Sequence, residues 1–251
     1  TDDGATFRST YDGSTHHLSP EGAAEIQSKL GADIQMVLDV CPPLPSPTAV
    51  VRLAVERTSL WAARAKAAHR RPDQALFGIV QGGVDATLRA ESAQHTVEVG
   101  FDGYGIGGLS VGESRAEMLP ALAAALAHLP ADRPRYLMGV GDPASLVEAV
   151  GLGVDQFDCV MQTRIGRHGT ALTSTGKLHI KNAAYLDDER PIDEGCQCFT
   201  CKRYSRAYLR HLYLAEEISF HRFATLHNLH YYLELMRGVR AAIEANAFLE
   251  F

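Results

Sequence analysis

The sequence has no apolar run long enough to cross a bilayer, and residues 1–20 are polar, so neither a membrane span nor a signal peptide is expected. Cysteine is scarce too: the chain has five, three of them within six positions, which suits a reducing compartment better than a disulfide scaffold. No G-x-G-x-x-G follows the Gly107-Gly108 pair, which argues against a dinucleotide site. We therefore expect a cytoplasmic protein without a membrane partner.

What remains is the composition of an ordinary globular protein, 46% hydrophobic and 22% charged, with enough apolar residues for a sizeable core. The net charge of −6 argues weakly against nucleic acid as a partner. Basic side chains are nevertheless concentrated in one fifth of the chain: Arg164, Arg167, His168, Lys177, Lys181, Lys202, Arg203, Arg206 and Arg210. This cluster indicates either a solvated basic face or a site for a polyanion.

A metal site is predicted from Cys196, Cys198 and Cys201, a C-x-C-x-x-C run, together with His227 downstream. Three thiols and one imidazole give the ligand number of tetrahedral Zn²⁺. An iron–sulfur cluster is the alternative, but it prefers four thiolates, and only Cys41 and Cys159 could supply the fourth. With no ligand position left open, we expect one structural Zn²⁺ per chain.

Short apolar strands alternate with helices, which predicts the α/β class and parallel βαβ units. Strands are expected to start near residues 34, 76, 103, 136, 154 and 177, and each ends in a glycine or polar residue, as in a (β/α) barrel. A complete TIM-type (β/α)8 barrel needs eight strands. We therefore expect an N-terminally incomplete barrel with a zinc-binding subdomain.

The expected organisation has three parts: a barrel portion over residues 1–185, a zinc-binding subdomain over 186–235, and a C-terminal helix over 236–251 that packs on the barrel. Local signals support several elements. Asp12-Gly13 is typical of a hairpin turn, Ser19-Pro20 opens a helix that Gly31 ends, and Ser114 with Glu117 forms a capping box.

Two carboxylates are candidates for chemistry, because Asp39 and Asp158 each end an apolar strand and would meet at the barrel mouth. Paired carboxylates suit glycosyl transfer, although surface carboxylates or helix caps are the plain alternative. Gln81 could bind the edge of a planar base, and Gly107 and Gly108 would let a ligand approach the backbone.

Five motifs occur in order along the chain: Val80-Gln-Gly-Gly83, Gly105-Ile-Gly-Gly-Leu-Ser-Val-Gly-Glu113, Tyr136-Leu-Met-Gly-Val-Gly141, Phe157-Asp-Cys-Val-Met-Gln-Thr-Arg164, and the cysteine run with His227. Together they closely resemble the tRNA-guanine transglycosylases, also called queuine tRNA-ribosyltransferases, of the bacterial branch. The resemblance covers essentially the whole chain and implies a barrel enzyme that acts on tRNA.

The resemblance also implies roles for individual residues. Asp158 would be the nucleophile that attacks C1′ of the ribose of guanine 34. The base pocket would comprise Asp39, Cys41, Gln81, Gly107, Gly108, Leu109, Val111, Glu113 and Met138. The anticodon loop would be held by Gly139, Val140, Gly141, Asp142, Pro143, Ala144, Ser145, Thr163, Arg164, Ile165, Gly166 and Arg167. Cys196, Cys198, Cys201 and His227 match the family's zinc ligands.

The implied reaction replaces guanine 34 of tRNAs with a G-U-N anticodon (the Asp, Asn, His and Tyr tRNAs) by preQ1, 7-aminomethyl-7-deazaguanine, in queuosine biosynthesis. Val111 stands where a glycine makes room for queuine, and Cys41 is the smaller bacterial-type residue, so preQ1 is the expected base. The family dimerises partly through the zinc subdomain, and Tyr204, Tyr208 and His211 share one helix face, so a homodimer is expected.

One departure from the family concerns its general acid/base, an aspartate followed by Ser-Gly-Gly. No Ser-Gly-Gly occurs in this sequence, so activity of the chain alone stays open. Two alternatives to the enzyme remain. One is a non-catalytic, zinc-containing tRNA-binding subunit or fragment of the family, and the other is an unrelated barrel lyase.

Overall fold

The computed structural model describes residues 1–251, which form two compact units. The first comprises residues 1–140 and 148–158, and the second comprises residues 141–147 and 159–251. Residues 159–185 belong to the second compact unit, whereas the sequence led us to assign them to the barrel portion. The finer division at residues 185 and 235 stays a prediction. No helix has the length and apolar character needed to span a membrane.

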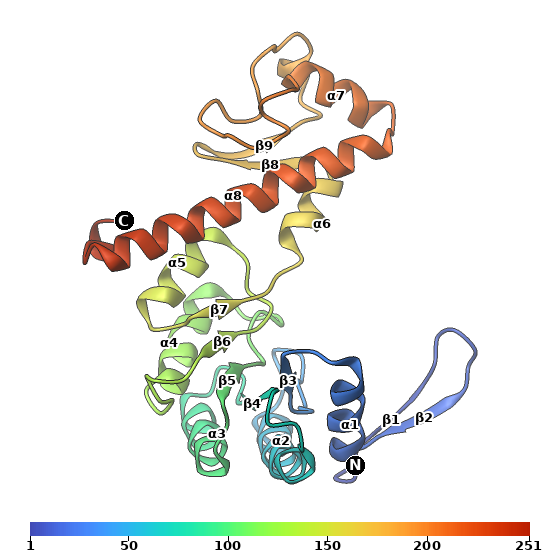
Figure 1. Ribbon diagram of the computed structural model, residues 1–251, viewed down its shortest axis with the longest axis vertical. Helices are drawn as coiled ribbons and strands as arrows, with labels where there is room; N and C mark the ends of the chain where they lie inside the picture. Colours follow the sequence, from blue (N-terminus) through green and yellow to red (C-terminus); the bar gives the residue numbers. More distant parts are fainter. The chain divides into compact units, whose positions relative to one another are not determined.

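The first unit is built on a five-stranded parallel sheet with strand order β3-β4-β5-β6-β7. Its strands are β3 (Ile34–Met36), β4 (Ala75–Val80), β5 (Gly103–Ile106), β6 (Arg135–Leu137) and β7 (Gln156–Phe157). The main connecting helices are α1 (Pro20–Leu30), α2 (Thr48–Ala68), α3 (Ala86–Val99) and α4 (Arg115–Leu126). Each helix packs on the next along the sheet (Figure 1). The α/β class and the partial barrel are confirmed.

Strand β4 shows why this sheet forms, since five of its six residues are buried. A parallel strand covered on both faces requires such a continuous apolar run. A Cβ atom on Gly78 would overlap Thr96 and Phe101, so this residue faces the helices. Phe77 and Ile79 point to the other face. The helix-side core continues through α3 and α4, where Leu122 is fully buried.

Helix ends in the first unit follow the sequence signals. The Ser19 hydroxyl accepts a hydrogen bond from the Gly22 N–H, and Gly31 ends α1 with φ of 75°. Ser114 and Glu117 form the expected capping box at the start of α4. A polar hairpin precedes α1, formed by β1 (Ala5–Arg8) and β2 (Thr15–Leu18), and Gly13 in its turn has φ of 73°.

The expected sixth barrel strand near residue 177 is wrong. This segment is β9 (Gly176–His179), which pairs antiparallel with β8 (Thr170–Thr173) in the second unit. Only Ser174 and Thr175 connect the two strands. A two-residue connection can join antiparallel strands but not parallel ones, which need a crossover of a dozen residues or more. The apolar pattern alone did not distinguish these cases.

The second unit holds the β8–β9 hairpin and the remaining helices. These are α6 (Met161–Arg167), η1 (Ala183–Tyr185), α7 (Arg206–Leu214), α8 (Ile218–Glu244) and η2 (Phe248–Glu250), while α5 (Pro143–Gly151) contains the point where the two units divide. The unit has its own core, centred on Leu178, Ile192, Leu209 and Phe220. Helix α8 begins at Ile218, well before the expected C-terminal helix at 236–251, so His227 lies inside it.

Asn228 ties three elements of the second unit together. Its buried side chain accepts a hydrogen bond from the Leu172 N–H at 3.0 Å. It donates to the carbonyl oxygens of Gln162 and Thr170, both at 3.1 Å. Helices α6 and α8 and strand β8 are therefore fixed to one another through one amide.

Candidate active site and metal centre

Glycines on β5 open space on the inner face of the sheet, opposite the helices. A Cβ atom on Gly103 would overlap the Phe77 ring, one on Gly105 would lie 2.9 Å from Met36, and one on Gly107 would lie 2.7 Å from Gln81. Alternate glycines thus accommodate larger side chains from the neighbouring strands. At the carboxyl end of the sheet this space is taken by a polar side chain, Gln81.

Asp39 and Gln81 form a hydrogen-bonded pair at that end of the sheet. The Gln81 Nε2 donates to Asp39 Oδ2 at 2.6 Å. Gln81 is fully buried, and its backbone N–H donates to Ser92 Oγ at 2.9 Å. Burial raises the pKa of Asp39 above its ordinary value, and the hydrogen bond from Gln81 opposes the rise. Gln81 Oε1 is buried and has no hydrogen-bond partner.

The turn after β5 lies directly against this pair. Gly108 has φ of 65°, and a Cβ atom there would overlap Gln81 Oε1, so only glycine fits. Leu109 is buried beside it, with 3% of its surface exposed. Burial, and then the charge of Asp39, raise the pKa of the Cys41 thiol. Asp39, Cys41, Gln81 and the two glycines are therefore neighbours, as the sequence led us to expect.

Residues 110–113 form a loop held from within. The Glu113 carboxylate accepts hydrogen bonds from the N–H groups of Ser110 and Val111, the latter at 3.0 Å. The Val111 carbonyl accepts from the Leu44 N–H at 3.1 Å. Gly112 has φ of 137°, and a Cβ atom there would overlap the Leu44 carbonyl. Glu113 thus fixes the loop that carries Val111, while Met138 borders Gly105 deeper along the sheet.

Arg89 is a residue of this site that sequence reasoning missed. It is fully buried on α3, and its guanidinium donates to the carbonyl oxygens of Gly83 at 2.7 Å, Gly107 at 2.6 Å and Gly108 at 2.9 Å. Burial lowers its pKa to about 10. One feature of the sequence could have identified Arg89: it lies on the same helix face as the small residues Ser92 and Thr96, which are also buried.

Asp158 lies just after β7, and its side chain is held by two donors. The Tyr136 hydroxyl donates to Oδ1 at 2.6 Å, and the Gly139 N–H donates to the same oxygen at 2.8 Å. Burial and the hydrogen bond to Asp158 raise the pKa of Tyr136 well above its ordinary value. Asp158 is exposed to solvent, and Oδ1 takes both bonds. Tyr136 is a second residue that was not singled out as part of the site.

The residues expected to hold the anticodon loop occur in two segments. In the first, Gly139 and Val140 belong to the first unit, while Gly141, Pro143 and Ala144 belong to the second. Asp142 caps α5 by accepting from the Ser145 N–H at 3.2 Å. The second segment is α6, described next.

On α6, the Thr163 hydroxyl donates to the Val160 carbonyl at 3.1 Å, and Ile165 is half-buried. A Cβ atom on Gly166 would lie 3.3 Å from the backbone of α8, so this glycine permits close helix packing. Arg164 and Arg167 are both exposed. The helix therefore presents two cations to solvent.

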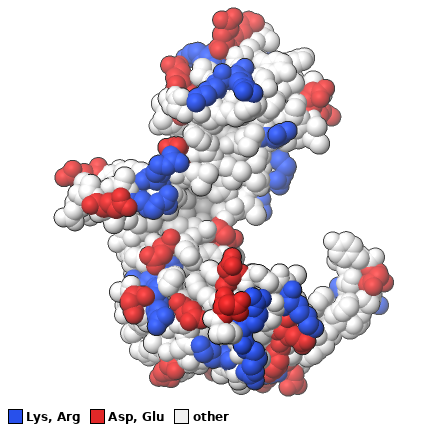
Figure 2. Space-filling model, in the orientation of Figure 1, with Lys and Arg blue, Asp and Glu red and all other residues white.

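The basic cluster in the sequence separates into engaged and free side chains. Arg206 forms an ion pair with Asp188 at 3.1 Å, and Arg210 donates to the Asn182 carbonyl. Arg203 lies 4.2 Å from the centre of the Phe199 ring. Other members are exposed, namely Arg164, Arg167, His168, Lys177, Lys181 and Lys202. Basic side chains occur together with acidic ones on the visible face of the second unit (Figure 2).

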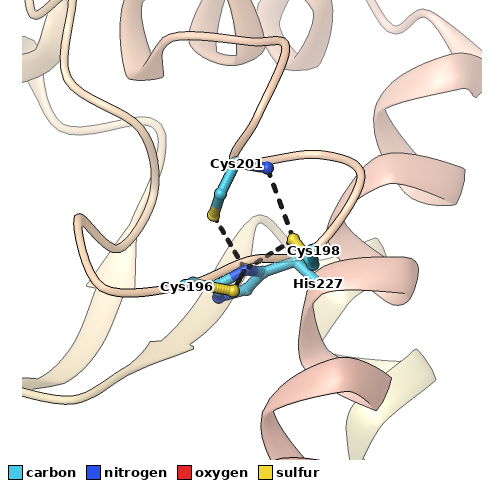
Figure 3. Close-up of side chains that lie close together, drawn as sticks. All are labelled: Cys196, Cys198, Cys201 and His227. Atoms are coloured by element: carbon cyan, nitrogen blue, oxygen red, sulfur yellow. Dashed lines mark hydrogen bonds between the residues drawn. The ribbon is translucent and has the colours of Figure 1, made fainter.

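Cys196, Cys198, Cys201 and His227 converge in the second unit, with their ligand atoms all within 4.8 Å of one another (Figure 3). His227 Nδ1 lies 3.7, 3.6 and 3.3 Å from the three Sγ atoms in that order. A tetrahedral ion bound at about 2.3 Å to sulfur and 2.0 Å to nitrogen would place these atoms about 3.6 Å apart. The four residues therefore fit such an ion.

Two further contacts prepare this cluster for a metal. His227 Nε2 lies 2.7 Å from the Leu172 carbonyl, which makes Nε2 the protonated nitrogen and leaves the Nδ1 lone pair facing the sulfurs. A hydrogen bond from Cys201 lowers the pKa of Cys198 to about 3 despite burial. The thiolate is the form that binds metals. All five cysteines of the chain are free of disulfides.

Comparison with known proteins identifies the family of the chain. The sequence model of the queuine tRNA-ribosyltransferase family matches residues 1–251. Proteins named queuine tRNA-ribosyltransferase are 56% identical in Syntrophobacter fumaroxidans over 98% of this chain, and 53% identical in Halothermothrix orenii and 51% in Staphylococcus aureus over 100% of it. The chain spans 66%, 67% and 66% of these relatives' lengths. The chain belongs to the queuine tRNA-ribosyltransferase family.

Proposed function

We propose that the protein is a tRNA-guanine transglycosylase that exchanges guanine 34 of G-U-N tRNAs, those for Asp, Asn, His and Tyr, for preQ1 in the cytoplasm. The observation that carries the proposal is the buried Asp39–Gln81 pair beside the Gly107-Gly108 turn, in a chain of this family. The polar groups of this pair suit the edge of a purine-like base. The exposed Asp158 supplies a nucleophile.

Base recognition would rest on matched donors and acceptors. The pyrimidine edge of guanine presents N–H donors, and an ionised Asp39 carboxylate presents only acceptors. Gln81 holds one Asp39 oxygen and offers its own free Oε1. Guanine and preQ1 share this edge, so the same groups serve the leaving and the incoming base.

The exchange would proceed by two displacements at the ribose C1′. Asp158 attacks C1′, a carbon–oxygen bond forms, and the bond between C1′ and the guanine nitrogen breaks. The nitrogen of preQ1 then attacks C1′ and releases Asp158. Two inversions retain the anomeric configuration. Guanine must gain a proton and preQ1 must lose one, and the expected acid/base aspartate before Ser-Gly-Gly does not occur in this sequence.

Recognition of tRNA would combine an extruded base with contacts to phosphates. A base can reach the Asp39–Gln81 pair only when it leaves the stack of the anticodon loop. The exposed cations Arg164 and Arg167 on α6 suit the phosphates that flank it. Local basic residues explain how a protein with a net charge of −6 could bind RNA.

We also propose that the ion in the cysteine–histidine cluster is Zn²⁺ with a structural role, because its four protein ligands leave no position for substrate. When bound, Zn²⁺ would supply cross-links between the 196–201 segment and α8. It takes no part in the displacement steps.

An aromatic surface on the second unit supports a homodimer. The rings of Tyr204 and Tyr208 stack with centroids 5.4 Å apart, and Tyr204 packs on Phe223. Phe199 and Tyr208 remain 43% and 45% exposed. Exposed aromatic side chains of this kind are enriched at interfaces. Light scattering should give a dimer mass at micromolar concentration, and Tyr208→Ala should shift it toward the monomer; a monomeric unmutated protein would contradict the dimer.

The test of the function is capture of a covalent adduct. The protein is incubated with a G-U-N tRNA and quenched in denaturant, and the protein–RNA species is resolved on a gel. The unmutated protein should form the adduct, and Asp158→Asn should not. Asp155→Asn, before β7, is the matched control and should retain it. Binding of tRNA with no adduct from any variant would favour the non-catalytic tRNA-binding subunit.

A further inference from the structure

The buried Arg89 makes an unusual set of contacts, because every hydrogen bond of its guanidinium goes to a backbone carbonyl. Besides Gly83, Gly107 and Gly108, its Nη1 lies 3.3 Å from the Val80 carbonyl. No carboxylate accepts a hydrogen bond from it. Burying a cation without a directly bonded acid is costly, and burial indeed lowers its pKa.

The four carbonyl groups belong to two turns of the barrel. Val80 and Gly83 lie at the end of β4 and in the turn before α3, and Gly107 and Gly108 form the turn after β5. A guanidinium has a rigid planar fork of donors, so it fixes both the separation and the tilt of the groups that it bonds. Arg89 therefore clamps together the turns that carry Gln81 and the glycine pair.

The clamp also sets the direction of the peptide N–H groups. A trans peptide is planar, and its N–H points opposite to its carbonyl oxygen. Because the Gly107 and Gly108 carbonyls point to Arg89, the N–H groups of Gly108 and Leu109 point away from it. The Gly108 N–H lies on the side of the Cys41 thiol, where it opposes the rise in the pKa of that thiol. This is the side of the Asp39–Gln81 pair.

Glu113 restrains the other end of the same loop. Its carboxylate accepts from the N–H groups of Ser110 and Val111, and its charge favours the protonated form of Arg89. One buried cation thus holds the carbonyl side of residues 107–108, and one carboxylate holds the N–H side of residues 110–111. Between them the Gly108 and Leu109 peptides are held through their neighbours, and of their N–H groups the Gly108 N–H faces the Cys41 thiol.

We infer that Arg89 is a positioning residue that aligns the Gly108 and Leu109 N–H groups toward the carbonyl oxygen of the bound base. The inference rests on the proposed function, in which guanine presents an acceptor O6 beside its donor edge. Arg89 itself does not touch the base. It acts through the two peptides that it holds.

The test uses Arg89→Lys and Arg89→Met, with Arg135→Met as the matched control. Arg135 also donates to three carbonyls, those of Leu129, Pro130 and Gly153, but it lies at the opposite, amino-terminal end of the sheet on β6. Two measurements are made on each variant: KM for free guanine and for tRNA in base exchange, and hydrogen–deuterium exchange of the amides at residues 107–111.

Lysine keeps the charge but not the fork. We expect Arg89→Lys to fold, to raise KM for guanine about tenfold with KM for tRNA unchanged, and to speed amide exchange at residues 107–111 about tenfold. Arg89→Met should raise KM for guanine and speed amide exchange at residues 107–111 more than Arg89→Lys does. Arg135→Met should leave both measurements as in the unmutated protein.

Unchanged amide exchange at residues 107–111 in folded Arg89→Lys would overturn the inference, as would equal rises in the two KM values, which would indicate general destabilisation. If Arg89→Met does not fold, the measurements on Arg89→Lys alone test the inference. If the unmutated protein exchanges no guanine, the proposed function fails, and the hydrogen–deuterium exchange still decides whether Arg89 holds the turn.

Discussion

The Tyr136 hydroxyl and the Asp158 carboxylate are joined by a 2.6 Å hydrogen bond between neighbouring strands, β6 and β7. With the Gly139 N–H on the same oxygen, two donors orient the carboxylate from one side. A nucleophilic carboxylate gains from such fixed orientation, because an aligned attack avoids the entropic cost of finding the geometry. Neither of these two donors bonds Oδ2, which is the oxygen that would attack C1′ in the proposed reaction.

Tyr136→Phe should therefore slow formation of the Asp158–tRNA adduct by about tenfold or more while leaving tRNA binding unchanged. A hydrogen bond to a charged group contributes about 1.5–3 kcal/mol, which sets this scale. Rapid-quench measurement of adduct formation gives the rate. Tyr104→Phe on β5 removes a hydroxyl from the same sheet and should have little effect. An unchanged rate of adduct formation in Tyr136→Phe would show that the Gly139 N–H alone is enough to orient the Asp158 carboxylate.

Binding of the base should depend on the ionisation of Asp39. Its pKa is raised by burial, so the carboxyl becomes protonated at a higher pH than an exposed aspartate. The protonated form cannot accept from both donors of guanine. KM for guanine should thus rise as pH falls through the raised pKa, while KM for tRNA follows a different profile. Asp39→Asn should weaken guanine binding and abolish this pH dependence, and Asp33→Asn, exposed just before β3, should not.

The same raised pKa fixes the sign of the contribution of Asp39 to stability. A group whose pKa is higher in the folded than in the unfolded protein stabilises the fold at low pH, below the unfolded value of about 4. That stability is lost as pH rises through the folded pKa. Asp39→Asn should consequently raise the melting temperature, relative to the unmutated protein, more at neutral pH than at acidic pH. If Asp39→Asn instead raised the melting temperature more at acidic pH, that result would contradict the burial of Asp39.

Removing the metal should unfold part of the second unit. Ligand sets of this kind bind Zn²⁺ with apparent energies of roughly 10–16 kcal/mol, which become folding energy. Chelation, or Cys198→Ser, should lower the metal content below one ion per chain and speed amide exchange around residues 196–227. Cys41→Ser, outside the cluster, should keep the metal. Iron instead of zinc in elemental analysis, or a folded metal-free protein, would refute the proposed zinc.

The choice of base should depend on Val111. This half-buried residue lies in the loop held by Glu113, and its branched side chain would occupy space that the cyclopentenediol of queuine requires. We expect preQ1 to be used at least about tenfold better than queuine, a difference of about 1.4 kcal/mol. Val111→Gly should narrow the gap, as measured by incorporation of each free base into a G-U-N tRNA. Equal use of both bases by unmutated protein would show that Val111 does not gate the pocket.

Local sequence signals predicted much of this fold. Gly31, Ser114 and Glu117 act at helix ends through neighbours three or four residues away, so their effect is visible in a short window. The metal ligands Cys196, Cys198 and Cys201 are similarly close in sequence. At these helix ends and in the cysteine run the pattern and the structure agree.

Features that depend on contacts between residues far apart in the sequence were harder to predict. The role of Arg89 depends on the Gly107 carbonyl 18 positions away, and an isolated arginine on a helix gives no sign of such a partner. Residues 176–179 have an apolar pattern that fits either strand direction, and only the two-residue turn decides it. Tyr136 was visible in its motif, but its bond to Asp158 spans 22 residues.

The adjacency of His227 and Asn228 on α8 connects the metal cluster to α6. His227 faces the cysteine cluster, and Asn228 holds the Gln162 carbonyl of α6, the helix that presents Arg164 and Arg167. Two events that bias one structural element are thermodynamically coupled, and the coupling is reciprocal. Under the proposed function, a metal bound by the cluster and tRNA bound at α6 would each strengthen the binding of the other. Partial loss of the metal should therefore weaken the proposed binding of the anticodon loop before it alters Asp158, which belongs to the first unit.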